Sequence, residues 1–152
     1  GDATITGSGP NVSITFNTAD NYVVTCPVTS ATASDSGASG TAIATVTVPF
    51  ASRVAAANFS YAVTVANGVY ELNGVANAGI AGSVGDVFHF DLSDASLSGH
   101  PFKIYTDPGM TTEVTVGIEQ DGTDLLFTPP IAGTFSYQCA NHANMGGDLT
   151  VN

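Results

Sequence analysis

The stretch YQCANHANMGG, residues 137–147, places three soft metal-ligating side chains close together. Cys139 offers a thiolate, His142 an imidazole and Met145 a thioether. This combination favours copper among the common metals. A trigonal site with one cysteine needs a second histidine, and His100, in SGHPFKIYT, is the obvious candidate. The sequence therefore predicts a copper site in which Met145 is the weak axial ligand.

β-Strands must position these ligands, because the apolar pattern has a period of two along nearly the whole chain. Segments such as VSITF, AIATVTV, DVFHFDL and TFSYQC alternate or are β-branched and aromatic, with turn-forming residues clustered between them. SRVAAANF, residues 52–59, is the only candidate for a short helix. We expect an all-β sandwich in which two strand-end loops converge on the metal.

The charge of the chain is scarce and one-sided. Its 152 residues include 13 acids and 2 bases, which gives a net charge of −11. Such a surface argues against binding to nucleic acid or to anionic membranes, and no apolar run is long enough to span a bilayer. The charge suits an exported protein, a saline habitat or a basic protein partner. We expect an extracytoplasmic location, which means secreted, on a cell surface or in a virion.

The two halves of the chain differ in composition. Residues 1–67 contain only four charged side chains and are rich in Ala, Ser and Thr. They include SATASDSGASGT, residues 30–41, whose low complexity predicts an exposed loop between strands. Residues 68–152 hold ten of the thirteen acids and all three histidines. We expect a β-rich region over 1–67 that mediates assembly and a second domain over 68–152, with the strand at residues 59–65 on either side.

Several motifs of the second half resemble the cupredoxin family of type 1 blue copper proteins. They are the Cys-x2-His-x2-Met loop with its upstream histidine, the strand GDVFHF at residues 85–90, and GTFSYQC at residues 133–139. The short ligand loop is most similar to that of the amicyanins, whereas plastocyanins have a longer gap before the methionine. The resemblance covers about residues 68–152 and implies a Greek-key β-sandwich. It implies equatorial copper ligands at His100, Cys139 and His142 and an axial ligand at Met145.

Pro101 departs from the pattern of this family. Members commonly have Asn after the first histidine, and its backbone N–H donates to the cysteine sulfur, whereas proline has no N–H. We expect this loss to change the basicity of the thiolate and the redox potential. The resemblance also offers the carbonyl of Gly99 as a distant fifth ligand. A looser resemblance links the chain to cupredoxin-like modules of virion and cell-surface structural proteins of marine microbes and phages.

Two other residues with metal-binding side chains are expected to have structural roles. His89 lies between Phe88 and Phe90, and strand alternation points it to the face opposite these two residues. We interpret His89 as structural. Met110, in the turn DPGM, is expected to pack or to lie in the loop.

Three further features are open to two interpretations each. Cys26 is most simply a small buried hydrophobe, and the alternative is a disulfide with Cys139, which would abolish the copper site. EQDGTD, residues 119–124, predicts a solvated hairpin turn, with calcium binding as a weak alternative. The sequons at Asn11 and Asn58 could carry glycans.

We expect no enzymatic activity. The sequence has no nucleophile elbow and no phosphate-binding glycine motif, and three histidines cannot build a trinuclear copper cluster. The leading hypothesis is a copper-binding subunit of an extracellular, surface or virion assembly, formed by copies of the chain. The first alternative is a soluble exported electron carrier that passes electrons through His142 to a basic redox partner. The second is a structural protein with an empty site, and a third, weaker one is copper storage or delivery.

Overall fold

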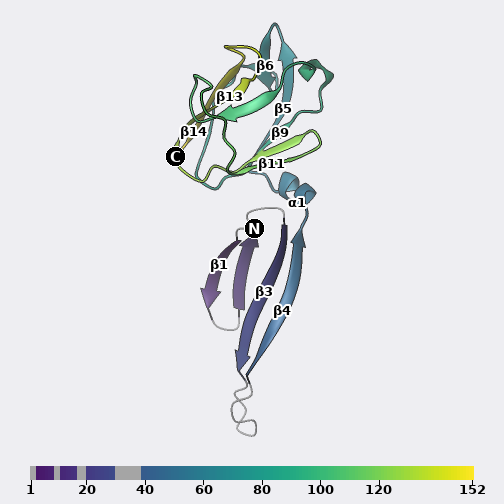
Figure 1. The fold of residues 1–152 in the computed structure, drawn as a ribbon, viewed down its shortest axis with the longest axis vertical. Helices are drawn as coiled ribbons and strands as arrows, with labels where there is room; N and C mark the ends of the chain where they lie inside the picture. The colour runs from purple at the N-terminus through teal and green to yellow at the C-terminus, as the bar shows by residue number, and fades with distance from the viewer. Residues whose placement is uncertain (1–2, 9–10, 17–19, 30–38) are drawn as a thin grey trace. The chain divides into compact units, whose positions relative to one another are not determined.

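The computed structural model describes the backbone of residues 3–8, 11–16, 20–29 and 39–152, and the side chains of Ile14 and residues 49–152. The chain divides into two compact units, Gly1–Ala55 and Ala56–Asn152 (Figure 1). None of the helices in the described ranges is long and apolar enough to cross a membrane.

The first unit is built from paired antiparallel strands. β1 (Ala3–Ser8) pairs with β2 (Asn11–Phe16), and β3 (Asp20–Thr29) pairs with β4 (Ser39–Val48). Residues 30–38 of the predicted loop lie outside the described residues, and residues 39–41, also expected in that loop, belong to β4. The unit ends in α1 (Phe50–Ala55), so the helix begins two residues before the predicted segment 52–59.

The second unit is a sandwich of two mixed sheets, as the period-two pattern predicts. The six-stranded sheet has the order β11 (Ile118–Asp121), β12 (Asp124–Phe127), β9 (Phe88–Asp91), β5 (Phe59–Ala66), β6 (Val69–Leu72) and β7 (Val75–Ala76). The four-stranded sheet has the order β10 (Phe102–Tyr105), β13 (Gly133–Cys139), β14 (Gly146–Val151) and β8 (Ile80–Gly82). A short 3-10 helix, η1 (Ala95–Leu97), follows β9.

Aromatic side chains from both sheets form the core between them. Phe90 of the six-stranded sheet packs on Phe102 of the four-stranded sheet, with ring centroids 4.9 Å apart. Tyr137 stacks on the same Phe102 ring at 5.4 Å. Phe90 and Tyr137 are fully buried, and burial of such side chains stabilises the fold by about 1.5–3 kcal/mol each. The core therefore joins the two sheets of the second unit directly.

His89 projects from the face of β9 opposite to Phe88 and Phe90, as the alternation predicts. Both phenylalanines are fully buried in the core. His89 Nε2 lies 2.7 Å from Asp124 Oδ1, and Nδ1 lies 3.3 Å from Ser60 Oγ. His89 thus links three neighbouring strands, β5, β9 and β12, which supports a structural role.

The division between the units falls at residues 55 and 56 rather than near residue 67. β5 determines this position, because it pairs antiparallel with β6 and parallel with β9. Val63 of β5 is also buried in the common core. The strand that the sequence left on either side of the boundary therefore belongs to the second unit.

The two turns singled out in the sequence are also turns in the structure. β11 and β12 form an antiparallel hairpin in which Asp121 faces Asp124, and Gly122 at the turn has a φ of 59°. Met110 N donates to the carbonyl oxygen of Asp107 at 3.2 Å, and its φ is 54°. Met110 therefore lies in a tight loop, as expected.

Candidate metal centre

The pairing of β10 with β13 brings the upstream histidine to the cysteine. In this antiparallel pair, Phe102 lies opposite Cys139. His100 precedes β10 by two residues and Cys139 is the last residue of β13, so both lie at the same end of the strand pair. His142 follows in the connection from β13 to β14. The end of β13 and two separate connections thus supply the three candidate ligands.

The donor atoms of these residues converge on one point. Cys139 Sγ lies 3.4 Å from His142 Nδ1 and 3.9 Å from His100 Nδ1, and the two Nδ1 atoms are 3.2 Å apart. Nitrogen and sulfur ligands bound at about 2.0 and 2.3 Å in a trigonal arrangement are roughly 3.5–3.7 Å from one another. The three side chains therefore fit a single metal ion with little movement.

The three ligands differ in their exposure to solvent. Cys139 is fully buried, His100 is partly buried and His142 is exposed. Cys139 is a free thiol in this structure, and the alternative of a disulfide with Cys26 stays a prediction. The side chain of Cys26 in β3 lies outside the described residues. The site is closed around the sulfur and open to solvent at His142.

Backbone and amide hydrogen bonds tie the ligand loop to the loop of His100. Cys139 N donates to the carbonyl of Met145 at 2.9 Å, which closes the ligand loop on itself. Ala140 N donates to the carbonyl of Pro101 at 2.9 Å. Asn141 Nδ2 donates to the carbonyl of Gly99 at 2.9 Å, the same carbonyl that the sequence offered as a fifth ligand. These bonds fix the separation of the two connections before any metal is bound.

Asn77 is a support of the ligand loop that the sequence analysis missed. Its Nδ2 donates to the carbonyl of Asn144 at 3.2 Å, and its Oδ1 accepts from Gly146 N at 3.0 Å. Asn77 and Asn144 both have a positive φ, of 43° and 62°, a conformation in which asparagine is enriched among non-glycine residues. Both bonds join residues that are far apart in the sequence, so no local pattern indicates them.

The two glycines after Met145 fit a close approach of the backbone. A Cβ on Gly146 would lie 2.8 Å from the Cα of Gln138 on β13. A Cβ on Gly147 would lie 2.6 Å from the carbonyl oxygen of Ala78. Because Gly146 and Gly147 have no Cβ, the start of β14 can lie directly against β13 and the carbonyl of Ala78. Glycine is the residue type that permits such an approach.

Met145 lies at the C-terminal end of the ligand loop and is almost fully buried. It belongs to the same buried core cluster as Cys139. Its thioether is therefore held on the protein side of the site rather than in solvent. An axial role for Met145 stays a prediction.

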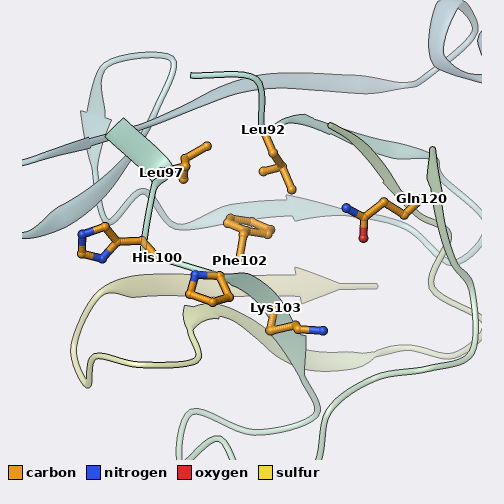
Figure 2. Close-up of a pocket in the computed structure, with 7 residues that line it drawn as sticks. Leu92, Leu97, His100, Phe102, Lys103 and Gln120 are labelled. Carbon is orange, nitrogen blue, oxygen red and sulfur yellow. The ribbon is translucent and has the colours of Figure 1, made fainter. Parts of the chain in front are cut away.

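A hollow of about 330 Å³ lies beside the first histidine (Figure 2). Leu92, Leu97 and the ring of Phe102 line it together with the polar side chains of Lys103 and Gln120. The ring of His100 points away from these side chains, which agrees with its approach to the two other ligands. Lys103, at the other end, forms an ion pair with Glu113 at 2.8 Å. His100 therefore borders the hollow, while its imidazole is directed to the candidate metal centre.

Comparison of the chain with protein-family models, with curated proteins and with solved structures gives no match. The chemistry of the site is therefore argued from its own residues.

The bonds made by Asn77 predict a selective effect on the ligand loop. In a Cys26→Ser background, we expect Asn77→Gly to lower the free energy of unfolding by about 1–2 kcal/mol, because two hydrogen bonds are lost. It should also speed the reaction of the Cys139 thiol with an aromatic disulfide reagent, because the loop that covers the sulfur is released.

Asn73→Gly is the matched control for this measurement. Asn73 also has a positive φ, of 51°, and its side chain also makes two backbone hydrogen bonds, to Ala62 N at 2.8 Å and to the carbonyl of Ser60 at 3.1 Å. Asn73→Gly should lower the free energy of unfolding by a similar amount without exposing the Cys139 thiol. Equal thiol reactivity in the two variants would contradict the role of Asn77.

Proposed function

We propose that the chain is a cupredoxin-like copper-binding protein, with His100, Cys139 and His142 as equatorial ligands and Met145 as the axial ligand. The observation that carries this proposal is the convergence of the three donor atoms, 3.2–3.9 Å apart, at one end of an all-β sandwich. Copper in such a site supplies reversible one-electron chemistry.

The donor set favours copper over zinc. In the described part of the chain, the cluster contains one thiolate and two imidazoles and no carboxylate. Zinc with three protein ligands usually keeps a water in the fourth position. Here Met145 lies in the same loop, where its carbonyl oxygen accepts from Cys139 N, and its thioether is a soft ligand suited to copper. Buried Cys139 holds its sulfur away from water, while exposed His142 is the ligand through which a partner has access.

Two features of the first unit support the proposal that the protein is part of an assembly. Its described strands form two separate two-stranded sheets, and a two-stranded hairpin alone is only marginally stable in water. Residues 1–67 carry four charged side chains, so the strand edges have few of the charges that usually prevent pairing between molecules. We propose that copies of the chain associate through this unit in an extracellular, surface or virion assembly.

A soluble electron carrier is the second candidate function. Exposed His142 lies between exposed Ala140 and Ala143, and small neighbours let a partner approach an imidazole closely. The net charge of −11 would steer a basic redox partner to the protein. The oligomeric state of the full chain distinguishes the two functions, because a carrier would be a monomer and an assembly subunit would form a larger species.

The metal assignment predicts an intense colour. Addition of Cu(II) to the apo protein should give a strong blue or green absorption from thiolate-to-copper charge transfer. Cys139→Ser should abolish this band, while Cys26→Ser should leave it unchanged because Cys26 is outside the ligand set. Absence of binding by the wild-type protein, or only the pale spectrum of a nitrogen and oxygen site, would leave a structural protein with an empty site.

We expect Met145 to set the reduction potential of the copper rather than to be required for copper binding. Met145→Leu should keep the metal and raise the reduction potential, because a weak donor to Cu(II) is removed. Cyclic voltammetry and the absorption spectrum of the copper-loaded variant measure the effect. An unchanged potential and spectrum would show that Met145 does not coordinate.

The proposed division of roles between the units predicts that residues 56–152 are sufficient for metal binding. This segment contains the described core cluster and all four ligands. We expect it to fold, to bind copper like the full chain and to sediment as a monomer, whereas the full chain forms a larger species. A full chain that stays monomeric at high concentration would favour the electron carrier, and an unfolded segment would mean that both units share one core.

A further inference from the structure

The residue before the first histidine, Gly99, lies in a tight turn that leads into the metal centre. Ser98 has a φ of −58° and a ψ of 120°, and Gly99 has a φ of 81°, which are the angles of a type II turn. His100 N donates to the carbonyl of Leu97 at 2.9 Å and closes this turn. The peptide between Gly99 and His100 therefore joins the turn directly to a candidate ligand.

Two hydrogen bonds hold this peptide, one at each of its polar groups. Its N–H donates to Leu97, and its carbonyl oxygen, that of Gly99, accepts from Asn141 Nδ2 at 2.9 Å. The N–H and the carbonyl of a trans peptide point in opposite directions, so the two bonds together fix its orientation. A Cβ on Gly99 would meet no atom within 4 Å, so packing around this residue does not add a restraint. The direction of the Gly99 carbonyl therefore depends on Leu97 and Asn141.

The next two carbonyls of the same connection also accept hydrogen bonds. The carbonyl of His100 accepts from the hydroxyl of Tyr70 at 2.8 Å, and that of Pro101 accepts from Ala140 N at 2.9 Å. Carbonyl oxygens are hard ligands that suit ions such as Mg²⁺, Ca²⁺ and Mn²⁺, whereas thiolate and thioether are soft ligands that suit copper. Each oxygen that could add a hard ligand from this connection is thus bound to a donor of the protein.

We propose that Asn141 is a specificity-determining residue of the metal centre, whose amide holds the carbonyl of Gly99 and prevents it from becoming a fifth ligand. This inference rests on the proposed copper site and concerns its coordination number. Asn141 lies between Cys139 and His142, so the ligand loop itself carries the group that occupies this oxygen. The site then keeps a soft donor set, without a carbonyl that would favour harder ions.

The test compares Asn141→Ala with Asn73→Ala in the full chain with Cys26→Ser. Asn73 is the matched control, because it is also exposed and its amide also donates to a backbone carbonyl, that of Ser60, at 3.1 Å. Each protein is saturated with Co(II). The thiolate-to-cobalt band reports coordination by Cys139. The intensity of the d–d bands reports the coordination number, because tetrahedral Co(II) absorbs far more strongly than five-coordinate Co(II).

We expect Asn141→Ala to keep the thiolate-to-cobalt band and to lose d–d intensity, because the released carbonyl of Gly99 adds a fifth ligand. Asn73→Ala should keep the full d–d intensity. Loss of loop support alone would weaken Co(II) binding without changing the coordination number, so the intensity separates the two roles. The proposal would be overturned by equal d–d intensities in the two variants, or by five-coordinate Co(II) in the protein with Asn141 intact.

Added azide distinguishes the carbonyl from a water molecule as the fifth ligand. Azide displaces a bound water and shifts the bands, whereas a carbonyl of the chain stays in place. Bands of Asn141→Ala that do not respond to azide would support the proposal, and bands that shift would overturn the role of the Gly99 carbonyl. A protein with Asn141 intact that shows no thiolate-to-cobalt band at all would instead refute the metal site, and this inference with it.

Discussion

The register between β10 and β13 is the constraint on which the metal centre depends. With Phe102 opposite Cys139, the connection that carries His100 emerges beside the end of β13. A slip of one residue would turn the side chain of Cys139 to the other face of the sheet. The aromatic contacts of Phe102 with Phe90 and Tyr137 oppose such a slip, because they bury it between the sheets. The packing of the core thus determines the geometry of the site.

The surroundings of Cys139 explain why a metal suits this site. The sulfur is fully buried, and a negative charge in such a place is costly without a cation and hydrogen bonds. The imidazoles of His100 and His142 lie beside the sulfur, where a cation bound by all three side chains would offset this charge. Because the backbone bonds of Cys139 and Ala140 hold the loop independently of any metal, the proposed ligands would need little rearrangement if a bound ion changed its charge.

The sequence was sufficient to predict the strands and the grouping of Cys139 with His142, because both signals are local. Period-two alternation identifies β9 and β13, and the spacing from Cys139 to His142 fits one loop. The supports of the site were not predictable in this way. The hydroxyl of Tyr70 donates to the carbonyl of His100, 30 residues away, and Asn77 accepts from Gly146 N, 69 residues away. Their contacts follow from strand order, which alternation does not specify. The boundary between the two units was placed near residue 67 for the same reason. Alternation does not reveal that β5 pairs with β6 and β9 of the second unit.

The uneven distribution of charge fits the proposed separation of roles. Residues 68–152 carry ten of the thirteen acids and one of the two bases, whereas residues 1–67 are nearly uncharged. If copies associate through the first unit, their metal-binding units repel one another through like charge. Exposed His142 would then remain free of neighbouring copies. The same repulsion weakens as salt screens it, so a saline habitat would permit closer packing of the copies.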